Sequence, residues 1–175
     1  MSPVKRLLAL VLTMLIAATL GACGAKLSEQ KGAPINGEGF SVKMPGKPTR
    51  MVRTVQTSAG PVQLTAYISH ADQEAFSISV ERIPQGAPFN LDGAVRGEVA
   101  GVHGTLQNVT ATTYQHFPAR GARITALSNG SPATVFERTI LANGEAFDLQ
   151  FVEAGSDVKT PPASYTTFLA SLKIT

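Results

Sequence analysis

The sequence has 175 residues, of which 43% are hydrophobic, 15% charged and 6% aromatic, with one cysteine and no tryptophan. This length suits a single globular domain, and the hydrophobic fraction is too high for a disordered chain. A lone cysteine excludes a disulfide within the chain and any site built from several thiolates. The net charge of +3 falls to +1 without Lys5 and Arg6, because 13 basic and 12 acidic residues remain, which argues against nucleic-acid binding.

The first 22 residues have the zones of an export signal. Lys5 and Arg6 precede an uncharged, mostly aliphatic run over residues 7–20. A run of this length forms about 21 Å of helix, which is shorter than the ~30 Å hydrocarbon core of a bilayer. Such a run is typical of a signal peptide and not of a permanent transmembrane helix.

The run ends in Leu20-Gly21-Ala22-Cys23, which resembles the lipobox of bacterial lipoproteins. The resemblance implies that Cys23 receives a diacylglyceryl group, that the leader 1–22 is cleaved, and that the new amino terminus is often acylated. Two or three acyl chains anchor a protein essentially permanently. We therefore expect a lipid-anchored protein of the cell membrane or outer membrane that faces away from the cytoplasm. The alternative is an ordinary secretory signal in which the cysteine is incidental.

Residues 23–38 show no hydrophobic periodicity and contain several glycines, which predicts a flexible tether before a domain over 39–175. From Phe40 onward, apolar and polar residues alternate, as in strands with one buried face. This alternation predicts strands near 40–44, 62–69, 76–81 and 147–151, with less regular ones near 50–57, 105–116 and 120–127. Residues 132–142 are apolar on both sides, which predicts a central strand covered on two faces. Asn143-Gly144 predicts a tight hairpin turn.

Two segments have helical spacing. Residues 91–103 place apolar side chains on one face, and Asn90 precedes them as a plausible N-cap. Near the end, Thr160-Pro161 predicts a second helix with proline in its first turn. Its apolar stripe consists of Tyr165, Phe168, Leu169 and Leu172. The pattern predicts an α+β domain with an antiparallel sheet of about seven to eight strands and two helices packed on it.

Several short motifs share their layout with a known group of proteins. The segments are GFSVKMPGKP at 39–48, LDGAV at 91–95 and FLASLK at 168–173. This layout resembles uncharacterised bacterial domains, often lipoproteins, whose fold is similar to that of the PsbP subunit of photosystem II. The resemblance spans roughly Gly39 to Thr175. It implies a PsbP-like sandwich of helices on an antiparallel sheet and a non-enzymatic accessory or binding role.

The sequence lacks the common catalytic signatures, including GxSxG, the P-loop, GxGxxG before a helix and HExxH. His70, His103 and His116 are the candidates for a histidine base, and each is also explained by a turn or a helix end. The segment from His70 to Glu74 is polar, but it falls in a predicted hairpin turn and is expected to be solvated. We therefore expect no catalytic residues, no metal site and no cofactor.

The candidate binding residues are arginines and glycines. Arg120, Arg123 and Arg138 fall in adjacent predicted strands, and Arg138 lies between Phe136 and Ile140 on one apolar face. A guanidinium in that place needs a structural ion pair, for example with Glu153 or Asp148, or else it contacts an anionic ligand. Glycines at 93, 97 and 101 recur every four residues of the first predicted helix (Gly93, Gly97, Gly101). They indicate either close packing of helix on sheet or a groove for a partner.

Three hypotheses of function follow. The first is a non-enzymatic envelope lipoprotein whose domain binds a partner, which we expect to be an envelope protein. The second is a carrier or sensor of a small apolar or lipid ligand, which requires a sizeable pocket lined by residues such as Phe136, Phe147, Phe151 and Phe168. The third is a hydrolase with an unusual site, in which a histidine, a carboxylate and a hydroxyl converge in a cleft.

Overall fold

The computed structural model describes residues 33–57, 60–71, 74–128, 130–154 and 158–175, so the leader, Cys23 and the first part of the predicted tether lie outside the described residues. The strands are β1 (Ala33–Gly37), β2 (Phe40–Met44), β3 (Thr49–Thr57), β4 (Gly60–Ala71), β5 (Glu74–Arg82), β6 (Thr105–Tyr114), β7 (Phe117–Ser128), β8 (Ser131–Ala142), β9 (Glu145–Ala154) and β10 (Lys173–Ile174). The helices are α2 (Leu91–Gly101) and α3 (Ala163–Ala170). Within these ranges, no helix is long and apolar enough to cross a membrane.

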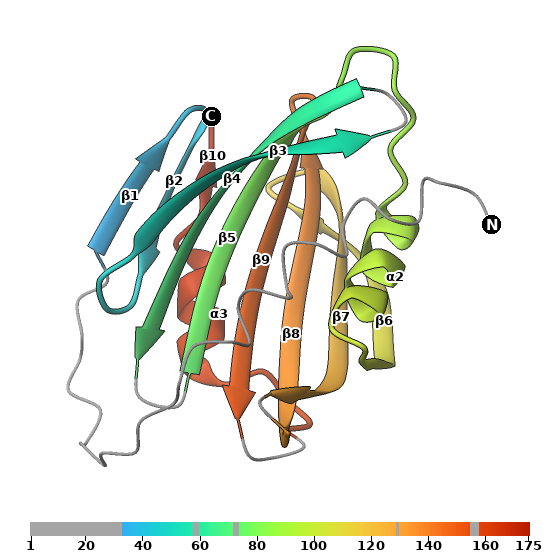
Figure 1. Ribbon diagram of the computed structural model, residues 1–175. Helices are drawn as coiled ribbons and strands as arrows, with labels where there is room; N and C mark the ends of the chain where they lie inside the picture. The colour runs from blue at the N-terminus through green and yellow to red at the C-terminus, as the bar shows by residue number, and fades with distance from the viewer. Residues whose placement is uncertain (1–32, 58–59, 72–73, 129, 155–157) are drawn as a thin grey trace.

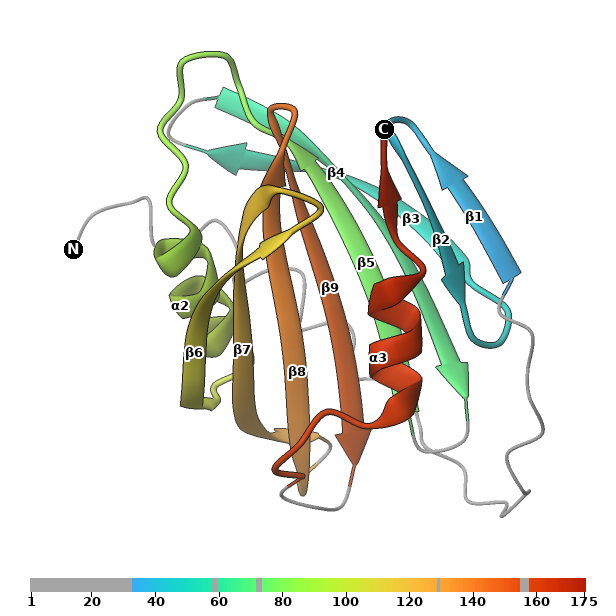
Figure 2. The ribbon, with the colours of Figure 1, turned by 180° about the vertical axis from the view of Figure 1, so that it is seen from behind.

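The centre of the fold is a seven-stranded antiparallel sheet in the order β3-β4-β5-β9-β8-β7-β6. A three-stranded sheet, β1-β2-β10, accompanies it. Figure 1 shows α2 on one face of the large sheet. The reverse view in Figure 2 shows α3 on the other face, beside the small sheet. The architecture is the predicted α+β arrangement, with a large antiparallel sheet between two helices.

The domain begins earlier than the sequence predicted. Residues 33–37, which were expected in the tether, form β1 and pair antiparallel with β2, so that Ile35 lies opposite Val42. Ile35 is buried in the main core. The sequence APING contains one large apolar residue, which gives no periodicity, so the hydrophobic pattern does not indicate this strand.

The N-terminal ends of the two helices agree with the sequence prediction in one case and differ from it in the other. The Oδ1 of Asn90 accepts a hydrogen bond from the backbone N–H of Gly93 at 3.0 Å, which confirms the predicted N-cap of α2. The predicted start of the second helix was wrong, because α3 begins at Ala163 with Pro162 in the N-cap position. Since Pro161 is followed by Pro162, steric clash disfavours a helical conformation at Pro161, and the helix starts only after the second proline.

Strand β8 is central, and apolar side chains are buried on both of its faces, as the sequence predicted. The larger core lies on the α3 side, where Phe76 packs edge-on against Phe151 and Phe168 with ring centroids 5.2 and 5.6 Å apart. A smaller core on the α2 side contains Val102, Ile124, Val135 and Val152. The β8–β9 turn has positive φ at both Asn143 and Gly144, which confirms the predicted tight hairpin.

Candidate functional site

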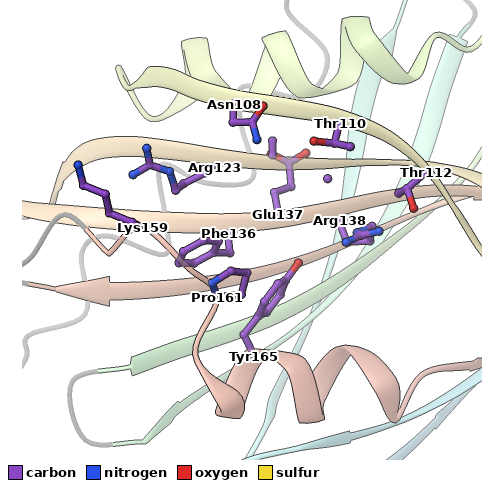
Figure 3. A pocket seen from close by; sticks show the side chains of 12 residues that line it. Asn108, Thr110, Thr112, Arg123, Phe136, Glu137, Arg138, Lys159, Pro161 and Tyr165 are labelled. Carbon is purple, nitrogen blue, oxygen red and sulfur yellow. The ribbon is translucent and has the colours of Figure 1, made fainter.

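The candidate site is a cavity of about 290 Å³ on the α3 face of the large sheet. On this face, α3 and the small sheet lie over the part of the large sheet formed by β5 and β9 (Figure 2). Strands β6 and β7, at the edge of the sheet, are not covered by them, and the cavity lies at this boundary. The cavity is lined by Asn108, Thr110 and Thr112 of β6, Gly121, Ala122 and Arg123 of β7, Phe136, Glu137 and Arg138 of β8, and Lys159, Pro161 and Tyr165 (Figure 3).

Strand register organises the floor of the cavity into two rows. In one row, Thr110 lies opposite Gly121, and Gly121 lies opposite Arg138. Because side chains alternate between the two faces of a sheet, all three residues share the cavity face. The neighbouring row places Asn108, Arg123 and Phe136 side by side in the same way.

Gly121 makes room for the guanidinium of Arg138. A Cβ atom on Gly121 would lie 3.3 Å from Nη2 and 3.4 Å from Cζ of Arg138, which is tighter than ordinary contact. The Arg138 side chain therefore extends over the bare backbone of β7, towards the strand that carries Thr110. Because glycine has no side chain, the guanidinium can lie close to the sheet at this position.

Three residues that line the cavity have a buried polar atom that forms no hydrogen bond of normal geometry among the described residues. These atoms are Nε of Arg138, the hydroxyl oxygen of Tyr165 and Oε2 of Glu137, whose side chain lies on the α2 face of the sheet. Figure 3 shows the Tyr165 hydroxyl pointing from α3 towards β8, the strand that carries Glu137 and Arg138. Burial raises the pKa of Tyr165, whereas the nearby charge of Arg138 and the close approach of its side chain to the hydroxyl lower it in part. Tyr165 therefore keeps its proton and is a hydrogen-bond donor.

The segment before α3 forms the rim of the cavity and is fixed to the sheet. Arg123 donates from Nη1 to the carbonyl oxygen of Val158 at 3.3 Å, and the N–H of Val158 donates to Oγ1 of Thr134 at 3.1 Å. These bonds place Lys159 and Pro161 at the cavity. Arg123 is thus part of the wall, and Lys159 adds a third positive charge to those of Arg123 and Arg138.

The structure separates the three candidate arginines. Arg123 and Arg138 line the cavity, whereas Arg120 alternates to the α2 face, where its Nε lies 2.6 Å from Oδ1 of Asp92 on α2. Arg120 is therefore in an ion pair with Asp92, which the sequence analysis did not name. Asp148 is not the partner of Arg138, because it lies opposite Thr139 in the register and so on the other face of the sheet.

The three glycines of α2 do not form one buried stripe. Gly97 and Gly101 are buried, whereas Gly93 is exposed. The three atoms nearest to a Cβ on Gly93 would all belong to Asn90, at 3.6 Å or more. None of the three lines the cavity. Their role as a groove for a partner remains a prediction.

On the α2 face, three acidic side chains are buried close together. They are Glu98 of α2, Glu137 of β8 and Asp148 of β9. The Thr139 hydroxyl donates to Glu137 at 2.6 Å, and Nε2 of Gln150 donates to Asp148 at 2.6 Å. We refer to Glu98, Glu137 and Asp148 as the acidic cluster.

Burial is the main cause of altered titration in the acidic cluster. It raises the pKa of Glu98 and Glu137 well above their usual range, and it raises the pKa of Asp148 to about 7. Repulsion from neighbouring carboxylates also raises the pKa of Glu98 and of Glu137. In the described ranges, no three His, Cys, Asp or Glu side chains are arranged to hold a metal ion.

The histidines lie at three separate places. His70 is near the end of β4, His103 follows α2, and His116 is in the β6–β7 turn, and all three are exposed. His103 and His116 have positive φ, in keeping with positions in turns. None of them lines the cavity, so the converging histidine, carboxylate and hydroxyl of the hydrolase hypothesis are not assembled there.

The phenylalanines proposed for an apolar pocket mainly fill the core. Phe147, Phe151 and Phe168 are almost fully buried and pack against other rings. Only Phe136 reaches the cavity, where its ring stacks on Tyr165 with centroids 6.0 Å apart. The expected lining of an apolar ligand site was therefore wrong for three of its four residues.

Sequence reasoning missed most of the cavity and all of the acidic cluster. The cavity residues of β6 had a usable signal, because Asn108, Thr110 and Thr112 alternate as polar residues on one side of a strand. Glu98 also had one, since it lies three residues after Val95 and four before Val102 on the apolar face of the helix. Lys159 had none, because its place depends on a loop that returns to the sheet.

Comparison with known proteins supports the fold. The sequence matches no protein-family model and no curated protein. The structure is similar to the solution structure of cyanobacterial PsbP (CyanoP) from Synechocystis, with a TM-score of 0.56, 12% identity, and coverage of 89% of this chain and 99% of that one.

A weaker similarity is to LpqN of Mycobacterium tuberculosis, a protein described as involved in cell envelope biogenesis. The TM-score is 0.39 and the identity 15%, over 82% of this chain and 85% of the other, which is too low to establish a shared fold. At 12% identity, the likeness to CyanoP bears on the fold and not on function. The chain therefore has a PsbP-like α+β fold.

Proposed function

We propose that this chain is an accessory lipoprotein of the bacterial cell envelope, anchored through Cys23, whose PsbP-like domain binds an envelope protein and catalyses no reaction. The observation that carries the binding role is the cavity over β6, β7 and β8, which collects positive and hydrogen-bonding side chains at a part of the sheet that α3 does not cover. The lipobox and the short leader support the anchor.

The anchor is tested by Cys23→Ser. The wild-type chain should incorporate labelled palmitate and sediment with membranes, whereas the variant should do neither, because serine lacks the thiol that receives the diacylglyceryl group. A variant that still sediments with membranes would show that something other than Cys23 holds the protein there. Fractionation against a periplasmic marker distinguishes release from degradation.

The partner is tested by photo-crosslinking in intact cells. A photoreactive residue at Asn108, on β6 beside the cavity, should capture an envelope protein. The matched control is the same residue at Val52 on β3, an exposed position at the opposite edge of the large sheet. Equal capture at both positions, or none at Asn108, would contradict the assignment of this face to partner binding.

An apolar-ligand carrier is a weaker candidate. The cavity volume of about 290 Å³ is at the lower end for a ligand pocket. Its lining includes two arginines, a lysine, two threonines and an asparagine, which a purely apolar ligand would leave without hydrogen bonds. Extraction of the purified protein with organic solvent should therefore yield no stoichiometric neutral lipid.

A further inference from the structure

We infer that the cavity over β6, β7 and β8 is a binding site for a small organic anion, whose phosphate or carboxylate group contacts Arg138 and Tyr165. This inference deepens the proposed function, since it names the chemistry that the binding face recognises. It rests on the geometry of four residues: Arg138, Gly121, Tyr165 and Phe136.

Arg138 is the charged contact. Its Nε is buried without a hydrogen-bond partner among the described residues, and its guanidinium lies over Gly121 at the cavity floor. A buried N–H without a partner costs stability, and an oxyanion would satisfy it with a charge-assisted hydrogen bond. A guanidinium presents several N–H donors in one plane, which suits the paired oxygens of a carboxylate or phosphate.

Tyr165 supplies the second donor from another element. Its hydroxyl is buried, approaches the side chain of Arg138 without forming a hydrogen bond of normal geometry, and points towards β8 (Figure 3). Because its raised pKa keeps the phenol protonated, it can donate to an anion and is not repelled by it. Arg138 of β8 and Tyr165 of α3 thus bring one charged and one neutral donor to the same place, where one oxyanion can contact both.

The remaining walls indicate that the anion belongs to an organic molecule. Phe136 and Pro161 give an apolar side to the cavity, and the volume of about 290 Å³ far exceeds that of one phosphate or carboxylate group. Thr110, Thr112 and Asn108 line the side formed by β6 and offer hydrogen-bonding groups to the rest of the ligand. Lys159 adds positive charge at the rim, which favours the approach of an anion.

Calorimetric titration of the full chain, purified in detergent, tests the site. The probes are methyl phosphate and phenyl phosphate in one arm and acetate and benzoate in the other, each against sodium chloride at equal ionic strength. We expect at least one arm to bind, and the arm that binds identifies the anion as phosphate or carboxylate. The aromatic member should bind more tightly than the methyl member, because its ring can pack against Phe136.

Three variants connect binding to the assigned residues. Arg138→Met should weaken binding roughly 10- to 100-fold, and Tyr165→Phe, which removes only a hydroxyl, roughly 3- to 10-fold. The control Arg96→Met removes the same charge from an exposed position on α2 and should leave the affinity unchanged. The melting temperature of Arg138→Met should not fall, since the variant removes a partly buried charge for which the described residues provide no ion pair.

Binding of none of the four probes beyond the chloride control would overturn the inference. Binding that Arg138→Met and Tyr165→Phe leave unchanged would also overturn it, as would a clear loss of stability in Arg138→Met, which would make Arg138 a structural residue. These results are independent of Cys23→Ser fractionation and of crosslinking. Failure of the anion site can therefore be distinguished from failure of the anchored accessory role.

Discussion

The acidic cluster predicts that this domain loses stability as the pH rises from acidic to neutral. Glu98, Glu137 and Asp148 approach one another from α2, β8 and β9, and all three are buried. Burial penalises their charged forms and raises the pKa of each one in the folded state. Arg120, a cation on the same face of the sheet, is engaged with Asp92.

The sign of the effect follows from proton linkage. An acid with a higher pKa in the folded than in the unfolded state holds more protons when folded, so the free energy of unfolding falls as pH rises between the two values. For Asp148 these are the ordinary 3.8 and about 7. Three pKa units at 1.36 kcal/mol each amount to about 4 kcal/mol, lost between about pH 4 and pH 7. Glu98 and Glu137 act in the same direction.

Urea unfolding at a series of pH values measures this loss. The free energy of unfolding of the wild-type domain should fall by several kcal/mol from about pH 5 to about pH 8. Asp148→Asn should flatten the profile, because asparagine is neutral at every pH and its oxygen can still accept the hydrogen bond from Gln150. The variant should therefore be more stable than the wild type at about pH 8, by up to about 4 kcal/mol.

The control is Glu153→Gln, which removes a carboxylate from the same strand outside the acidic cluster. It should keep the pH profile of the wild type. A wild-type stability that is constant or rises between about pH 5 and pH 8 would refute the reasoning. So would an Asp148→Asn profile as steep as that of the wild type, since the titrating group would then lie elsewhere.

Two further predictions concern single contacts. Gly121→Ala should change the free energy of unfolding by less than about 1 kcal/mol, because the better strand propensity of alanine offsets its tight contact with Arg138. The variant should nevertheless weaken anion binding, because the new methyl group displaces the Arg138 guanidinium. Unchanged affinity in calorimetry would contradict this packing argument. Asn90→Ala should lower the free energy of unfolding in urea by about 1 kcal/mol, because it removes the N-cap of α2. Asn90→Asp should retain most of that stability, and equal losses in both variants would argue against a capping role.

Much of the fold could be predicted because local patterns and tertiary structure agree. Phe40, Val42 and Met44 alternate in the sequence and are buried in the core, and Asn143-Gly144 forms the turn that its backbone preferences favour. The exceptions were local conflicts. Helix α3 starts later than expected because Pro161 precedes another proline, and β1 was not predicted because Ile35 is its one large apolar residue.

The site was less predictable, because it depends on which face of the sheet each side chain occupies. The sequence analysis named Arg120, Arg123 and Arg138 together and could not distinguish among them. In the register Arg120 lies opposite Thr139, so its side chain is on the α2 face and not in the cavity. Tyr165 was read correctly as part of the apolar stripe of the last helix, yet its hydroxyl reaches the cavity. A pattern of apolar residues describes where a ring packs and not where its polar tip points.

Strand β8 shows how the fold keeps opposite charges apart. Glu137 and Arg138 are adjacent in the chain, but the pleat sends one side chain to the acidic cluster and the other to the cavity. Neither can neutralise the other, so each retains polar atoms that lack partners among the described residues. Neutral replacements of buried groups usually destabilise a protein, whereas Arg138→Met and Asp148→Asn are expected to preserve or raise stability at about pH 8. The cavity and the acidic cluster, which lie on opposite faces of the large sheet, are therefore the two places where we expect polar groups to lower the folding stability of this chain.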